Sequence, residues 1–439
     1  MKHRTHALVA LGLSTTMILA ACGGDDDDGG DADAPAASDV ADATDGADAS
    51  AATAAGGDDT AAAPSGDGAS LTMLIASSGD AETAAVTEAA DAWAAESGNS
   101  IEVLVATDMN QELAQGFASG NPPDIFYLDA SRFADNAAAG NLHAYEAEDN
   151  DDFYEPLRQT FTFDGTQYCA PKDFSTLALQ INTAAWEAAG LTDDDIPTTY
   201  EELATVAEQL TTDGQVGLAL GPGIDRAGAF VVGSGGWWLN DDSTEATANS
   251  PEVLAGLQYV QDNIESGNFA LSSALDAGWG GEAFGTERAA MTVEGNWIRG
   301  AMTNDYPDVG YTVAELPEGP EGPGTLLFTQ CWGVAAESDA QDQAVDLVNF
   351  LTAPEQQMGF AEGFGVMPSR QSAAADYEAA FPDDAAFIAG GEYGHGPINA
   401  PSMEAVVADL NSQLEAIASA DLESVVESFD TNAAAELGG

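Results

Sequence analysis

The chain has 439 residues and a formal net charge of −66 at pH 7, with nine lysines and arginines against 75 aspartates and glutamates. This length exceeds what one small domain needs and fits two lobes. The charge excludes nucleic acid as a partner, and it makes an anionic membrane surface repel the body of the protein.

The N-terminus has the pattern of a secretion signal. Lys2 and Arg4 precede an apolar run, Ala7–Ala21, that is short for a membrane span. The run ends in Leu19–Cys22 (LAAC), which resembles the bacterial lipobox, where cleavage leaves a lipid-bearing cysteine as the first residue. We therefore expect a signal peptide at 1–21 and a lipid anchor on Cys22 that holds the protein at the extracellular face of the cell membrane. The alternative is an ordinary secretory signal with a chance cysteine.

Residues 22–70 are expected to form a tether. From Gly23 to Ser70 the chain has 13 aspartates and no lysine, arginine, glutamate or aromatic residue. Such a segment buries too little apolar surface to offset its ordering entropy, so it should be disordered. Asp25–Asp28 could hold calcium, but the loop with a terminal glutamate that a dedicated calcium site needs does not follow.

The folded part opens with alternating strands and helices. Three short apolar runs predict strands: Leu71–Ala76, Ile101–Ala106 and Asp124–Leu128. The stripe of Ala85, Ala89 and Trp93 predicts a helix after the first strand, and a second helix is expected at Gln111–Ser119. This order indicates parallel strands with crossover helices, so a ligand should lie beyond the carboxyl ends of the strands. Those ends are followed by Ser77–Glu82 and Asp129–Arg132.

Later segments predict further helices. Thr198 and Thr199 precede two glutamates, which is typical of a capped helix start, and this helix should run to about Leu210. Ser250-Pro251 starts another, with Gly267 as its stop. The tail from Ser402 to Leu437 has helical periodicity.

The scarcity of basic residues excludes several chemistries. After the signal there is one lysine, Lys172, and it lacks the context of a phosphate-binding loop. His143 and His395 are too few for a His/Cys metal site, and no Gly-x-Ser-x-Gly elbow accompanies them. We therefore expect no metal and no cofactor. A two-carboxylate hydrolase is not excluded, because carboxylates are frequent throughout the chain.

Two cysteines remain after the signal, Cys169 and Cys331. Outside the cytoplasm such a pair predicts a disulfide, and the alternative is two buried free thiols.

Six segments in order resemble the extracellular solute-binding proteins of ABC importers, the group that includes maltose-binding protein. The resemblance covers about Leu71 to Gly439. The segments are GNPPDIFYLDASRF (120–133), YCAPKDFSTLALQINTAAWEAAGL (168–191), PTTYEELATVAEQL (197–210), AFGTERAAMTVEGNW (283–297), CWGVAAES (331–338) and AVDLVNFLTAPEQQ (344–357).

The resemblance implies an α/β, two-lobed periplasmic-binding-protein fold, each lobe a sheet flanked by helices, that closes on a solute. The first lobe would hold 71–173 and 332–385, and the second 174–331 and 386–439. Hinge strands would be Lys172–Leu179 and Leu326–Trp332, which brings the two cysteines to neighbouring strands. The protein would be a monomer without enzyme activity that delivers its solute to membrane permease subunits.

The expected solute site combines aromatic faces with polar groups, as sugar recognition requires. On the first lobe and hinge the candidates are Asp80, Glu82, Asp129, Ser131, Arg132, Asp173 and Ser175. On the second lobe they are Arg226, Trp237, Trp279 and Trp297, and Arg370 is a further candidate. The alternatives are a core position for Trp297, a surface charge for Arg132 and a structural ion pair for Lys172.

The solute is expected to be a mono- or disaccharide. A polyol, a polyamine or glycerol phosphate on the same fold is the first alternative. A surface-anchored carbohydrate hydrolase is the second.

Overall fold

The computed structural model describes residues 68–77 and 79–438. The predicted signal peptide, Cys22 and the tether up to residue 67 lie outside the described residues. Within the described part, no helix is long and apolar enough to cross a membrane.

The first sheet is built from the predicted strand–helix repeats. Its parallel strands lie in the order β2-β1-β3. They are β1 (Ser70–Ile75), β2 (Ser100–Val105) and β3 (Ile125–Asp129), with α1 (Asp80–Ser97), α2 (Met109–Ser119) and α3 (Ala130–Ala138) after them in turn. Gly98 ends α1 with φ +76°, a conformation that glycine adopts without strain. The predicted repeats are therefore confirmed to within a few residues.

The second sheet has the order β6-β9-β7-β8, with β10 antiparallel to β6. Its strands are β7 (Val216–Leu220), β8 (Phe269–Leu271), β9 (Ala289–Gly295) and β10 (Tyr311–Ala314). The helices between them are α6 (Tyr200–Leu210), α7 (Ile224–Gly233), α8 (Pro251–Glu265), α9 (Gly280–Gly285) and α10 (Ile298–Asn304). The predicted starts are confirmed: Thr199 caps α6 and Ser250 caps α8, with Pro251 in the first turn.

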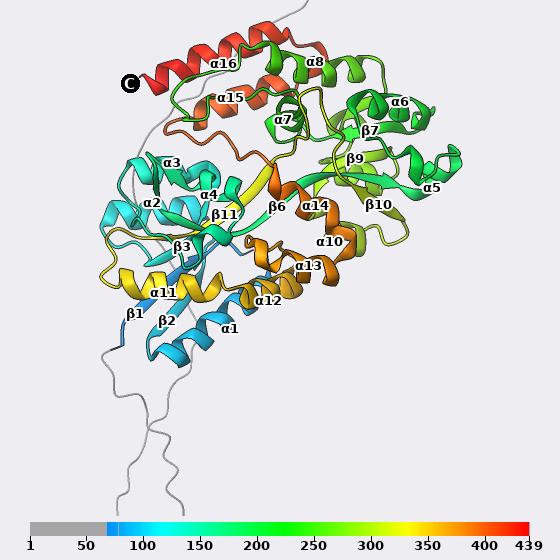
Figure 1. Cartoon of the computed structure of the whole chain (residues 1–439). Helices are drawn as coiled ribbons and strands as arrows, with labels where there is room; N and C mark the ends of the chain where they lie inside the picture. Colours follow the sequence, from blue (N-terminus) through cyan, green and yellow to red (C-terminus); the bar gives the residue numbers. More distant parts are fainter. Residues whose placement is uncertain (1–67, 78, 439) are drawn as a thin grey trace, which may run out of the picture. The chain divides into compact units, whose positions relative to one another are not determined.

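Two long strands join the sheets (Figure 1). The first half of β6 (Cys169–Asn182) pairs with β11 (Leu327–Val334), and its second half pairs with β9 and β10. The other edge of β11 pairs with β3. The expected lobe boundaries at 173/174 and 331/332 thus fall inside β6 and β11.

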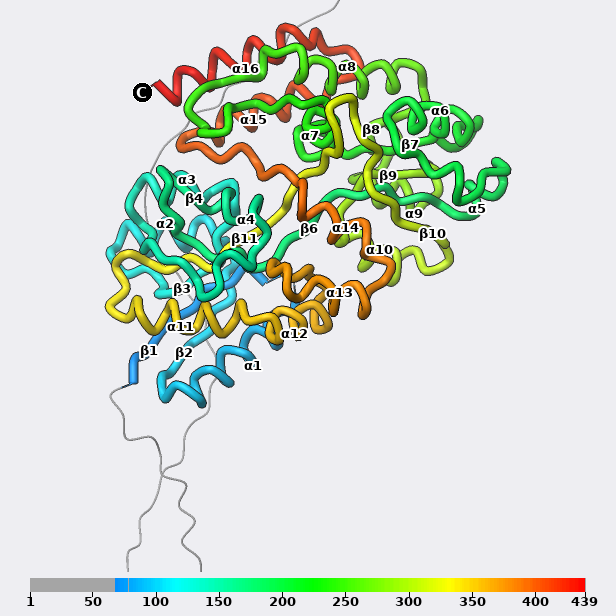
Figure 2. The backbone as a smooth tube through the Cα atoms, in the orientation of Figure 1, coloured from blue at the N-terminus to red at the C-terminus, as the bar shows by residue number. Residues whose placement is uncertain are grey.

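The remaining elements cover the two sheets and their junction. They are α4 (Glu155–Thr160), β4 (Thr162–Phe163), β5 (Thr166–Gln167), α5 (Thr183–Ala188), α11 (Gln341–Leu351), α12 (Pro354–Phe364), α13 (Ala374–Ala380), α14 (Ala385–Ala389), α15 (Glu404–Leu414) and α16 (Leu422–Leu437). The helical tail is confirmed as α15 and α16. A third crossing links α14 to α15, and His395 there exchanges backbone hydrogen bonds with Thr325 and Leu327 (Figure 2).

Each lobe has its own core. In the first lobe Trp93, Tyr127 and Trp332 pack together, and in the second Phe230, Trp238 and Phe429 do so. Burying each large side chain stabilises the fold by roughly 1.5–3 kcal/mol. The two-lobed α/β fold therefore rests on two separate apolar interiors joined by the crossing strands.

The Cys169–Cys331 disulfide is present and links β6 to β11. Both cysteines are fully buried beside Phe126 and Leu128 of the first lobe. The structure therefore confirms the disulfide over two free thiols.

Candidate ligand-binding site

A cavity of about 400 Å³ lies where elements of both lobes meet the crossing strands. The end of β3 and the start of α3 form one side, and α7 and α15 form the other. Its polar lining residues include Asp129, Ser131, Arg132, Asp225, Thr329, His395, Glu404 and Asn411. We call this space the inter-lobe cavity.

The inter-lobe cavity also has aromatic walls. Trp237 is half-buried and packs on the His395 ring at a centroid distance of 4.0 Å. Its neighbour Trp238 is fully buried against Phe429. Phe328 of β11 adds a second aromatic ring to the lining. Of the two adjacent tryptophans, Trp238 therefore belongs to the core and Trp237, the one predicted for the site, lines the cavity.

Arg132 joins the two sides of the inter-lobe cavity. Its guanidinium forms a two-pronged ion pair with Glu404 at the start of α15, with Nη2 2.7 Å from Oε1. The arginine hydrogen bond lowers the pKa of the Glu404 carboxyl below its ordinary value. Ser131 next to it donates its hydroxyl to Asp129, at 2.6 Å. The structure thus places three predicted residues, Asp129, Ser131 and Arg132, on one wall.

Trp297 is exposed yet held in place. Of its side chain and backbone together, 38% remains accessible, which is rare among the large apolar residues of the described part. Its Nε1 donates to Glu294 at 3.0 Å, and its ring meets Phe328 edge-on at 5.1 Å. Gly295 lies directly against the ring, since a Cβ there would come within 2.2 Å of it. A fixed, exposed aromatic face is what stacking on a sugar ring requires.

Arg226 belongs to the same group of residues. Its Nη2 lies 2.5 Å from Oε2 of Glu294, which is fully buried at the end of β9. The guanidinium carbon lies 5.4 Å from the Trp297 ring centroid and 5.8 Å from that of Phe328. We call Arg226, Glu294, Trp297 and Phe328 the Trp297 cluster, and Phe328 connects it to the inter-lobe cavity.

Glu82 and Asp173 form a buried cluster with the lone lysine of the described part. Lys172 Nζ lies 3.2 Å from Glu82, is hydrogen-bonded to Asp173 and lies 4.4 Å from the Tyr127 ring centroid. Burial opposes the lysine charge, but Asp173, Tyr127 and Glu82 together raise its pKa above the ordinary value. Lys172 therefore forms the structural ion pair that the sequence analysis gave as an alternative to a ligand contact.

The other predicted residues have different surroundings. Ser175 is buried and accepts the backbone N–H of Asn296, just before Trp297, at 3.2 Å. Trp279 is half-buried with its ring folded over Gly281. Asp80 is an exposed residue in the first turn of α1. None of these three lines the inter-lobe cavity.

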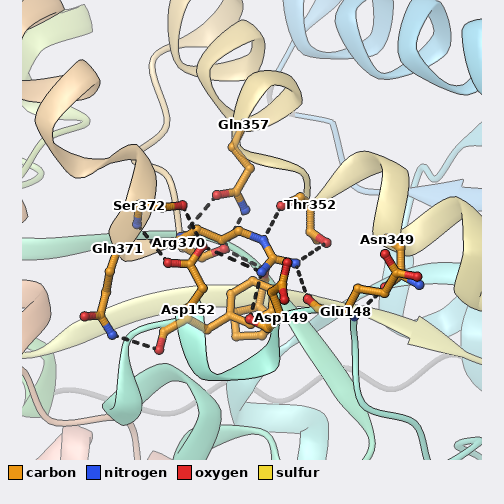
Figure 3. Close-up of polar contacts among 12 residues, drawn as sticks. Glu148, Asp149, Asp152, Asn349, Thr352, Gln357, Arg370, Gln371 and Ser372 are labelled. Carbon is orange, nitrogen blue, oxygen red and sulfur yellow. Dashed lines mark hydrogen bonds and ion pairs between the residues drawn. The ribbon is translucent and has the colours of Figure 1, made fainter.

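Arg370 lies away from the inter-lobe cavity, in the first lobe, and its donors are used by the protein (Figure 3). Its guanidinium donates to the backbone carbonyls of Thr352 at 2.5 Å, Glu148 at 2.8 Å and Asp149 at 3.0 Å. It also lies over the Phe153 ring, 4.2 Å from the centroid. This geometry favours a structural role for Arg370 over the ligand contact predicted from the sequence.

We predict that Arg370→Met lowers the free energy of unfolding by about 3 kcal/mol, because buried carbonyls lose charged donors. Arg370→Lys should rescue little, since an ammonium cannot replace the fork of donors. Chemical denaturation measures both variants. Solute affinity at a temperature where the variant is folded should be unchanged, and a large affinity loss would return Arg370 to the site.

Several residues of the site were missed by sequence reasoning: Asp225, Glu294, Phe328, His395 and Glu404. Asp225 and Glu294 each lie within three residues of a predicted residue, so their neighbours pointed to the region. His395 and Glu404 had no such signal, because the third crossing that carries His395 and the position of α15, which begins at Glu404, were not predicted.

A cavity between two α/β lobes, with an exposed tryptophan beside it, defines a two-lobed binding protein. The family described as "Bacterial extracellular solute-binding protein" matches residues 88–389, which is more than half of the chain. The chain therefore belongs to this family.

Similar proteins agree with this assignment. The diacetylchitobiose binding protein DasA of Streptomyces coelicolor is 23% identical over 284 residues, covering 62% of this chain and 66% of DasA, just under two thirds. A cyclic α-maltosyl-1,6-maltose binding protein from Arthrobacter globiformis has a TM-score of 0.75 at 23% identity, over 84% of this chain and 99% of that chain. The sugar-binding protein MalE from Xanthomonas citri also gives 0.75, at 18% identity, over 84% and 97%. At these identities the solved structures show the fold alone.

Proposed function

We propose that this protein is a lipid-anchored extracellular receptor that binds a mono- or disaccharide between its lobes and delivers it to an ABC import permease. It acts as a monomer, without catalysis. The observation that carries the proposal is the fixed, exposed Trp297 ring next to the inter-lobe cavity. The names of the similar proteins, all binders of saccharides, support the same class.

The lobes that close on the solute are, in this proposal, 71–173 with 332–385 and 174–331 with 386–439. The strand pairing supports a division within β6, whose first half pairs with β11 and whose second half pairs with β9. Solute binding would favour the closed arrangement through contacts that the open one lacks.

A thermal-shift screen of the purified chain tests the function. The compounds are mono- and disaccharides, polyols, polyamines and glycerol phosphate, and hits are measured by calorimetry. We expect stoichiometric binding of a saccharide and an unaltered solute after prolonged incubation. Recovery of cleaved sugar would favour the hydrolase, and binding of a non-sugar alone would favour the first alternative.

The anchor is tested by Cys22→Ser in a bacterial host. We expect the variant to lose lipidation and to leave the membrane fraction for the soluble one. The wild-type protein should be extracted only by detergent. Membrane retention of the variant would show that Cys22 is not the anchor.

The ion pair between Arg132 and Glu404 should support closure. We predict that Arg132→Ala weakens solute binding by at most about fivefold, the range of exposed ion pairs. The melting temperature without solute should hardly change. Calorimetry on Arg132→Ala, Glu404→Gln and the double variant measures their coupling. Fully additive losses would mean that the pair does not act as a unit.

A further inference from the structure

The basic residues of the described part are all bound to the protein's own acceptors. There are one lysine and six arginines in these residues. Their partners are Glu404 for Arg132, Asp151 for Arg158, Glu82 and Asp173 for Lys172, Glu294 for Arg226, the carbonyls of Leu275 and Asp276 for Arg288, Asp384 for Arg299, and the carbonyls described above for Arg370. A phosphate or carboxylate on a solute would therefore have to compete with an internal acceptor at each of these cations.

Two carboxylates of the inter-lobe cavity, by contrast, have no ion-pair partner among the described residues. Asp129 ends β3 on the first-lobe side, and Asp225 is in the first turn of α7 on the second-lobe side. Both are exposed, and within residues 68–77 and 79–438 neither takes part in an ion pair. The guanidinium of Arg226 donates to the backbone carbonyl of Asp225 at 2.9 Å and to the Glu294 carboxylate at 2.5 Å, and not to the Asp225 carboxylate.

The contacts of the two aspartates within the protein leave carboxylate oxygens free to accept further hydrogen bonds. Oδ1 of Asp129 caps α3 by accepting from Ser131 N–H at 2.9 Å and from its hydroxyl. Although part of Asp225 is exposed, desolvation by the surrounding cavity walls raises the pKa of its carboxyl; the charge of Arg226 opposes this shift and the charge of Asp129 adds to it. Both carboxylates line the same cavity, so a positive group between them would relieve the repulsion of their like charges.

The aromatic lining of the inter-lobe cavity suits a positively charged group. Trp237 and Phe328 line the same inter-lobe cavity as the two carboxylates. An ammonium held against an aromatic face gains from the negative charge of the π-system. Carboxylates that accept hydrogen bonds from an ammonium add a charge-assisted contact.

From this arrangement we infer that the solute is an amino sugar with a free, protonated amine, which Asp129 and Asp225 contact from opposite lobes. The inference rests on the proposed function and narrows it. It also disfavours sugar phosphates and sugar acids, because Arg132, the basic residue that lines the cavity, is already paired with Glu404.

Three disaccharides with the same β-1,4-linked backbone test this. Cellobiose carries a hydroxyl at carbon 2, N,N′-diacetylchitobiose a neutral acetamide, and chitobiose diamine an ammonium. Calorimetry with the purified full chain should give the diamine at least about tenfold tighter binding than the other two, as one or two charged hydrogen bonds provide. D-Glucuronate should not bind.

Substitutions distinguish a specific contact of the amine with Asp129 and Asp225 from a general effect of the acidic chain. Asp129→Asn and Asp225→Asn keep the size of each side chain and should each weaken diamine binding about tenfold, a larger loss than either causes for cellobiose. Asp194→Asn removes the same charge from an exposed site outside the cavity and is the control. An equal loss in this control would overturn the inference.

The remaining outcomes are also decisive. If cellobiose or diacetylchitobiose binds as tightly as the diamine, the inference is overturned while the proposed function stands. If no saccharide of the series binds, and none does in the wider screen, both fail together.

Discussion

Trp297→Ala is expected to weaken solute binding by about 2–4 kcal/mol, the cost typical of a binding hot spot. The ring is exposed and already oriented by Glu294, Phe328 and Gly295, so a sugar can stack on it without ordering it first. The protein without solute should lose little stability, because the removed ring buries only part of its surface. Calorimetry gives the affinity, and thermal unfolding without solute gives the stability.

Trp238→Ala is the matched control for this variant. Trp238 is fully buried in the second-lobe core, so its truncation should lower the free energy of unfolding by about 3–5 kcal/mol. Solute affinity in the folded fraction should be nearly unchanged. If Trp297→Ala behaves like Trp238→Ala, with a large loss of stability and unaltered affinity, Trp297 is not part of the site.

Loss of the disulfide should lower stability as strongly as truncation of a core tryptophan. The Cys169→Ala/Cys331→Ala variant is expected to be less stable by about 3–5 kcal/mol, because a bond between residues 162 apart constrains the unfolded chain strongly. Alanine avoids placing a hydroxyl in a fully buried site. Denaturant unfolding measures the difference.

Reduction of the wild-type protein is the control for this variant. A strong reductant should shift its unfolding midpoint down toward that of the double variant and leave the variant itself unmoved. Equal midpoints for oxidised and reduced wild type would contradict the prediction, as would free alkylation of both thiols in the native protein.

The sequence predicted the elements well where local patterns decide them. The first three strands, the caps of α6 and α8 and the disulfide pairing followed from spacing, from turn chemistry or from the resemblance. Much of the site depends on contacts between distant residues. Arg370 illustrates this, because the carbonyl of Asp149 that it binds lies 221 residues earlier, and no pattern near Arg370 indicates it.

Contacts between distant residues also decide which partners the predicted charged residues have. The ligand contact expected for Arg132 stays a prediction, and the partner that the structure gives it, Glu404, lies 272 residues later on a helix whose position the sequence did not give. Lys172 could be read as a ligand contact or an ion pair until the structure placed α1 and its Glu82 beside β6. Burial of charge is a property of the folded packing, so composition alone cannot assign it.

The covalent link between β6 and β11 lies at one end of their shared ladder, on the first-lobe side. The two strands therefore cannot slide along each other, and a rotation of one lobe against the other has to bend both at the same place, beyond Thr176 and before Leu327. In the proposed closure the disulfide would keep the first-lobe ends of β6 and β11 together, so the motion would be confined to the chain beyond them.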